Sequence, residues 1–278
     1  MEARGVVGFA DYRSPGGRAL SRIAIIYGPL MSRRRGLSLG INLFPGLSVC
    51  SFNCVYCFRG GAHIHVPWVY SAEARVSPSD VVDALATALR RIGNEAERLR
   101  SIDFSGNGEP TLHPRFAETV RAVREFIEDK GLSVSLGLFT NATRLCSPGV
   151  LEALAYLDHV EAKLDAAQEW KLQAINQPSK GISLDNILEC LSMLRGRFHG
   201  EIALQVLLLG FDAINNYGCS DAEALARAAT RIQPDVINLY TAYAPPRLSS
   251  VEKAPREIME RYATILRKYG LRVRVFPE

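Results

Sequence analysis

This 278-residue sequence lacks long apolar runs. No stretch of about 18 or more apolar residues is present, so a transmembrane helix is not predicted. A basic segment followed by an apolar one is also missing from the start of the chain, so a secretory signal is not predicted. We therefore expect a cytoplasmic protein with no membrane contact. The 47% apolar and 22% charged residues are typical of a globular protein with a sizeable core.

Lysine is also scarce, and the first of the six lysines is Lys130. Arginine supplies the early positive charge: residues 1–60 hold eight arginines against two acidic residues, a net +6, whereas the whole chain sums to +4. Such a bias is typical of a solvated surface, of an inward-facing arginine, or of contact with a polyanion such as RNA. The nucleic-acid interpretation makes Arg33, Arg34 and Arg35 the candidate contacts.

Three of the six cysteines lie within eight residues, as Cys50, Cys54 and Cys57, with no fourth cysteine nearby. A structural zinc site takes four ligands, and His63 could supply the fourth. A [4Fe-4S] cluster on three thiolates instead leaves one iron open. Both interpretations remain at this point. The tight spacing indicates metal binding in a reducing compartment rather than a disulfide framework, and Cys190 is predicted to be a core residue of a helix.

Predicted strands and helices alternate from residue 37 onward. The strands are expected at 37–42, 101–104, 134–139, 160–164, 202–209, 236–240 and 273–276. The helices are expected at 78–92, 116–127, 148–157, 183–194, 220–233 and 255–269. This alternation predicts an α/β fold with a parallel sheet and right-handed crossovers. We expect a partial (βα)6 TIM-like barrel as a single domain over 37–278, preceded by an irregular basic arm over 1–36.

Polar residues gather where the predicted strands end, and ligands of parallel α/β sheets bind at that edge. These candidates are Gly106, Asn107, Gly108, Glu109, Asn141, Lys163, Asp165 and Gln205. Ordinary turn chemistry and local ion pairing also account for single members of the set. Their convergence at one edge predicts a binding site.

The cysteine spacing, with Tyr56 before the last cysteine, resembles that of the radical S-adenosylmethionine (SAM) enzymes. The segment Gly106-Asn107-Gly108-Glu109-Pro110 resembles the GGEP turn of that family, with Asn107 in place of a glycine. The resemblance implies a [4Fe-4S] cluster on the three catalytic cysteines, whose open iron binds SAM. An external ferredoxin- or flavodoxin-type donor would supply the electron that cleaves SAM to a 5'-deoxyadenosyl radical. The strand-end residues are then expected to bind SAM.

Further segments resemble one subgroup, which is related to the archaeal tRNA 4-demethylwyosine synthases. They are residues 27–41, 163–166, 175–178 and 243–247. Those synthases carry a second cluster on N-terminal cysteines and use lysine chemistry, but residues 1–49 here contain neither residue type. The resemblance therefore implies a single-cluster form whose substrate is tRNA or a modified nucleoside. The alternatives are a glycyl-radical-enzyme activase or another protein-modifying enzyme of the family, and a zinc-containing RNA-binding module.

Overall fold

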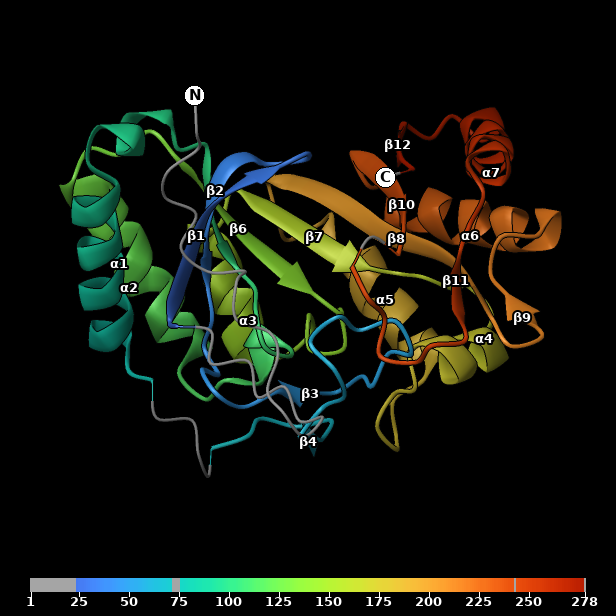
Figure 1. Ribbon diagram of the computed structural model, residues 1–278, viewed down its shortest axis with the longest axis horizontal. Helices are drawn as coiled ribbons and strands as arrows, with labels where there is room; N and C mark the ends of the chain where they lie inside the picture. Colours follow the sequence, from blue (N-terminus) through green and yellow to red (C-terminus); the bar gives the residue numbers. More distant parts are fainter. Residues whose placement is uncertain (1–23, 72–75, 243, 278) are drawn as a thin grey trace.

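The computed structural model describes residues 24–71, 76–242 and 244–277. Its main sheet has the strand order β1-β2-β5-β6-β7-β8-β10-β12 and curls into a partial barrel with helices packed along its outer side (Figure 1). Strands β2 to β12 on this path pair in parallel. The predicted α/β partial barrel is confirmed.

The main-sheet strands are β1 (Ile26–Ser32), β2 (Gly36–Ile41), β5 (Ser101–Phe104), β6 (Ser135–Thr140), β7 (His159–Lys163), β8 (Glu201–Phe211), β10 (Val236–Thr241) and β12 (Val273–Phe276). Short strands flank them: β3 (Val49–Cys50), β4 (Ile64–His65), β9 (Ile214–Asn215) and β11 (Val251–Lys253). The α-helices are α1 (Pro78–Ile92), α2 (Phe116–Asp129), α3 (Pro148–Ala153), α4 (Glu169–Ile175), α5 (Leu184–Leu194), α6 (Cys219–Ile232) and α7 (Arg256–Lys268).

The end of the predicted N-terminal arm is a strand, which corrects the expectation of irregular structure up to residue 36. Strand β1 pairs antiparallel with β2 at the edge of the sheet, with a break in register between Tyr27 and Leu30. Pro29 lies within this break and hid the strand from the sequence pattern, because proline is tolerated only at edges and bulges. Residues 1–23 of the predicted arm lie outside the described residues.

Capping boxes in the sequence predict two helix starts, one from Ser77 with Asp80 and one from Ser220 with Glu223. Ser77 caps α1 as expected, since its hydroxyl accepts from Asp80 N while the Asp80 carboxylate accepts from Ser77 N. At α6 the predicted pair of Ser220 and Glu223 is wrong. Here the Asp221 carboxylate accepts from the Gly218 N–H at 2.9 Å, and Gly218 is the cap residue. The helix therefore begins at Cys219, two residues earlier than a cap at Ser220 predicts.

The turn between β1 and β2 directs two arginines into the barrel, in agreement with the inward-facing interpretation of the early positive charge. Arg34 forms an ion pair with Glu161 of β7, and its side chain is 22% exposed. Arg35 forms an ion pair with Asp103 of β5 at 3.1 Å, and its side chain is 10% exposed. Since both guanidinium groups bind carboxylates inside the protein, they are not free to contact RNA phosphates.

Arg34 also lies over two aromatic rings, with its Cζ 5.5 Å from the Phe139 centroid and 5.1 Å from the Tyr240 centroid. Arg33 lies over the Phe276 ring at 5.8 Å. Such cation–π contacts favour a cation on a ring face. The arginine triplet therefore binds the β1–β2 turn to strands β6, β10 and β12.

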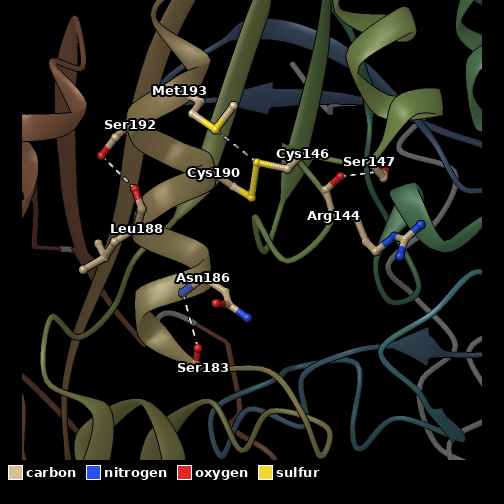
Figure 2. The surroundings of a disulfide bond; sticks show 9 residues. All are labelled: Arg144, Cys146, Ser147, Ser183, Asn186, Leu188, Cys190, Ser192 and Met193. Carbon is tan, nitrogen blue, oxygen red and sulfur yellow. Dashed lines mark hydrogen bonds between the residues drawn. A yellow bond between two sulfur atoms is a disulfide. The ribbon is translucent and has the colours of Figure 1, made fainter.

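A disulfide joins Cys146, in the loop after β6, to Cys190 of α5 (Figure 2). The two Cα atoms are 5.3 Å apart, within the range of disulfides. Cys190 lies on a helix against the core as predicted, but its bond to Cys146 was not predicted. The loop after β6 folds back against α5. Local sequence patterns do not reveal this approach, because the partners are 44 residues apart. Among the described helices, none has the length and apolar character needed to cross a membrane.

We expect Cys190→Ser to lower the free energy of unfolding of the oxidised protein by about 4 kcal/mol, because the bridge no longer restricts the unfolded chain. Chemical denaturation with and without a thiol reductant measures the loss, and the reductant should abolish the difference between variant and wild type. Cys219→Ser is the matched control, since Cys219 is a free, exposed cysteine. Equal stability of C190S and wild type without reductant would contradict a formed bridge.

Candidate active site

The cysteine loop begins at β3, beside the carboxyl ends of the barrel strands. Cys50, Cys54 and Cys57 are free thiols, with Cys54 buried and the other two partly buried. Strand β3 pairs in parallel with β4, and the Val66 N–H donates to Cys50 O at 3.2 Å. The structure thus brings all three predicted ligands into one folded loop.

Two distant segments fix the backbone of this loop. The end of α4 accepts from it, with Val55 N to Ile175 O at 2.9 Å and Asn53 N to Asn176 O at 2.9 Å. Arg247, which follows β10, donates from Nε to Cys54 O at 3.1 Å and from Nη2 to Asn53 O at 2.8 Å. Because the Arg247 guanidinium bridges these two successive carbonyls, it holds the backbone of the loop at the second cysteine.

The turn after β5 packs directly on β3. Gly108 has φ +85° and forms a bridge with Val49, and the next amide, Glu109 N, donates to Val49 O at 2.8 Å. A Cβ on Gly108 would lie 1.8 Å from Val49 O, so only glycine fits. A Cβ on Gly106 would likewise meet the Asn42 side chain at 2.8 Å. These glycines permit the close approach that positions Cys50.

The side chains of Glu109 and Asn107 point into the protein. Glu109 accepts from the Thr111 hydroxyl at 2.7 Å, from the Thr140 hydroxyl at 2.8 Å and from Asn141 N at 2.6 Å. Burial raises the pKa of Glu109, although these donors partly offset it. Asn107 Nδ2 donates to Phe44 O at 3.2 Å. Both side chains tie the turn to its neighbours, so a SAM contact through this turn's backbone stays a prediction.

Lys163 lies inside the barrel among polar partners. Its Nζ donates to Gln205 Oε1 at 2.9 Å and to the Tyr240 hydroxyl at 3.2 Å, and lies 3.8 Å from Asp165. Burial alone would lower the pKa of Lys163, but Asp165 and Tyr240 raise it above its usual range. The side chain is therefore an ammonium, which favours an anion-binding role over a free amine that forms a Schiff base.

Asp165 connects this group to the cysteine loop. Its carboxylate accepts from the Tyr56 hydroxyl, from Asn176 Nδ2 at 2.7 Å and from Leu207 N at 2.9 Å. Tyr56 and Asn176 were not predicted as site residues, although both lie in segments that carried the family resemblance. Their side-chain partners are more than 10 residues away in sequence, which no local pattern reveals.

Two asparagine amides donate to cysteine sulfurs. Asn141 Nδ2 lies 3.6 Å from Cys50 Sγ and 2.8 Å from Ser51 Oγ, while its Oδ1 accepts from the Thr143 hydroxyl at 2.8 Å. Asn176 Nδ2 lies 3.5 Å from Cys54 Sγ. The Asn141 side chain is thus bonded within the loop region, and its predicted contact with the SAM ribose stays a prediction.

Burial raises the pKa of all three thiols, and that of Cys54 reaches about 11. Without metal these thiols are protonated, so metal binding would release their protons. No three His, Cys, Asp or Glu side chains of the described residues converge around one metal ion. His63 Nδ1 accepts a hydrogen bond from Ser48 N at 2.9 Å, so this ring nitrogen already has a partner other than a metal. Three thiolates with amide donors suit a [4Fe-4S] cluster with one open iron better than a Cys3His zinc site.

A family model described as "Radical SAM superfamily" matches residues 45–215. The chain belongs to the radical SAM superfamily. This membership supports an enzyme and decides against a non-enzymatic zinc module. It also implies SAM and a [4Fe-4S] cluster as cofactors and, as for radical SAM enzymes in general, an external electron donor.

The chain is also similar to individual proteins in sequence or in fold. A UPF0026 protein of Methanocaldococcus jannaschii is 27% identical over 243 residues, which is 87% of this chain and 71% of that protein. A radical SAM methyltransferase from Sphaerobacter thermophilus has a similar fold, with a TM-score of 0.65, 17% identity and coverage of 88% of this chain and 67% of the other. An archaeal TYW1 structure gives a TM-score of 0.53 at 14% identity, covering 86% and 74%. The last two show the fold alone.

We expect Gly108→Ala to displace β3 and to reduce the iron bound after anaerobic reconstitution, because the new Cβ would overlap Val49 O. Iron and sulfide content per protein measures the loss. Gly46→Ala is the matched control: Gly46 has φ +78°, so its backbone strain is similar, but a Cβ there would have nothing within 4 Å. Equal iron content of G108A and G46A would show that the close approach does not position Cys50.

Proposed function

We propose that this protein cleaves SAM reductively and uses the resulting radical to abstract hydrogen from RNA, with tRNA as the leading candidate. The observation that carries the first part is the folded loop of three cysteines with no fourth cysteine in reach among the described residues. When bound, the cluster and SAM supply the electron-driven cleavage and the carbon radical. The chain's own residues bind and orient these cofactors and exclude water from the site.

The interior of the barrel supplies the proposed SAM contacts. The Lys163 ammonium suits a carboxylate, and its partner Gln205 adds an amide that both donates and accepts hydrogen bonds. Both side chains are partly exposed, in contrast to Asp165, which is 1% exposed and bonded on both oxygens. We assign Lys163 and Gln205 to SAM binding and Asp165 to holding Tyr56 and Asn176 in place.

We expect Cys54→Ala to bind little cluster and to release no 5'-deoxyadenosine when the reconstituted protein is given dithionite and SAM. The physical reason is that two thiolates cannot hold a cluster that needs three. Chromatographic detection of 5'-deoxyadenosine is the measurement, and Cys219→Ser, an exposed cysteine outside the loop, is the control. Product release by C54A at the wild-type rate would refute the role of these cysteines.

The RNA proposal rests on exposed aromatic side chains and one half-buried arginine beside the cysteine loop. Phe58 follows Cys57 directly and is 51% exposed, and Trp68 is 61% exposed two residues after the backbone amide that binds Cys50. Arg59 lies over the Phe58 ring at 4.6 Å, and its buried Nε has no hydrogen-bond partner among the described residues. Exposed rings that stack on bases, together with an arginine for phosphates, are typical of proteins that bind single-stranded nucleic acid.

We expect Trp68→Ala to weaken binding of unmodified tRNA by about 1–3 kcal/mol through lost base stacking. Arg59→Glu should weaken it further and lower the slope of log affinity against log salt by about 1. Filter binding at several salt concentrations measures both effects. Arg91→Glu on α1 is the control, because Arg91 is exposed outside the loop that carries these aromatics.

Equal tRNA affinity in W68A, R59E and R91E would remove the RNA proposal. The alternatives would then be a glycyl-radical-enzyme activase or another protein-modifying enzyme, since exposed aromatic side chains also suit a peptide. Hydrogen exchange into 5'-deoxyadenosine from a deuterated candidate peptide or tRNA would distinguish these substrates. SAM cleavage without added substrate tests the cofactor chemistry separately.

A further inference from the structure

Asn176 is buried without solvent contact at the end of α4, where it joins the cysteine loop to the interior of the barrel. Its backbone accepts from Asn53 N, and its side chain lies between Cys54 and Asp165. A fully buried amide needs hydrogen-bond partners. The partners of the Asn176 side chain therefore indicate its role in the site.

The Nδ2 group has two hydrogens and three acceptors within hydrogen-bond distance. One hydrogen goes to Asp165 Oδ2 at 2.7 Å, and the other faces Cys54 Sγ at 3.5 Å. The Tyr56 hydroxyl, which donates to Asp165, can also accept this second hydrogen at 3.4 Å. Both amide hydrogens of Asn176 therefore have defined acceptors, one of them a cluster ligand.

The opposite orientation of the amide is unfavourable. If the amide flipped, Oδ1 would face the Asp165 carboxylate and the Cys54 sulfur, neither of which donates once the thiol is a thiolate. In the observed orientation Oδ1 is buried without a partner among the described residues, which is costly. The Asp165 carboxylate is fixed by Leu207 N at 2.9 Å, so it holds the N–H side toward Cys54 despite that cost.

A donor on a cluster thiolate changes the redox balance of the cluster. Reduction adds one electron from the external donor without making or breaking a bond, so it adds one unit of negative charge to the cluster and its ligands. A hydrogen bond to a ligand sulfur stabilises the more negative state and is one of the factors that set the potential. Asp165 would act in the opposite sense, but Lys163 lies 3.8 Å from it and compensates its charge.

We propose that Asn176 is a positioning residue that donates its side-chain N–H to the Cys54 thiolate of the loaded enzyme and thereby raises the reduction potential of the cluster. This rests on the cluster being bound as in the proposed function. Asp165, oriented by Tyr56, keeps the amide in this orientation. Asn141 donates to Cys50 in a similar way, but its amide is also held by Ser51 and Thr143.

The test is a redox titration of the reconstituted enzyme followed by electron paramagnetic resonance, with the midpoint potential as the readout. Asn176→Leu has nearly the same volume and no donor. We expect the ratio of reduced to oxidised cluster at a fixed poise to fall about tenfold, a shift of about 59 mV to more negative potential for one electron. Asn176→Asp should shift it in the same direction, because the donor is replaced by an acceptor. Asn186→Leu, on the exposed start of α5, is the control and should titrate as wild type.

A wild-type midpoint in fully loaded N176L and N176D would overturn the proposal and leave Asn176 a purely structural residue. Failure of both variants to load a cluster, with circular dichroism unchanged, would also overturn it by making Asn176 a determinant of assembly. Failure of the proposed function looks different: wild-type protein would then bind no cluster or release no 5'-deoxyadenosine.

Discussion

Three carboxylates buried inside the barrel are each paired with a cation. Arg35 meets Asp103, Arg34 meets Glu161, and Lys163 lies beside Asp165. A buried carboxylate without such a partner would cost several kcal/mol. Burial would raise the pKa of Glu161, but Arg34 lowers it below its usual range, whereas burial still raises the pKa of Asp103 beside Arg35. The Arg34 and Arg35 pairs join the β1–β2 turn to strands β7 and β5. The site depends on these pairs, because these strands carry its residues.

The third pair links this interior to the cysteine loop. Lys163 ends strand β7 and Asp165 follows it; Asp165 binds Tyr56 and Asn176, and Asn176 in turn contacts Cys54. A charged group inside the barrel thereby also orients the side chain that contacts Cys54, one of the three proposed cluster ligands. Substitutions of Asp165 would therefore disturb folding and site geometry together, which is why Asn176 is the better position for separating the two.

Much of the fold could be predicted, because local patterns determine it. The apolar positions Val81 and Leu85 that follow the Ser77 cap identified α1, and the run from Ile202 to Leu209 identified β8. Strand β1 could not be predicted, since Pro29 breaks its alternation and only pairing with β2 makes it a strand. Helix α4, with seven residues, is too short for its periodicity to be recognised.

For the site, the sequence predicted the cysteine loop and the strand ends, because chain order places both at one edge of a parallel sheet. The sequence did not predict which side chains bond to one another there. Glu109 and Asn107 point inward, and Arg34 and Arg35 bind carboxylates inside the barrel. The Cys146–Cys190 bridge and the contacts of Asn176 and Arg247 join residues remote in sequence, so only tertiary structure reveals them.

The bond from Arg247 to Asn53 O spans 194 residues, and this separation has a consequence for biosynthesis. At ribosomal rates of about 5–20 residues per second, the three thiols are made about 10–40 seconds before the arginine that holds their loop. During that interval the nascent chain carries cysteines without the backbone contacts that shape their loop. Stable loading of a cluster is therefore expected only after Arg247 has been made and the loop has folded.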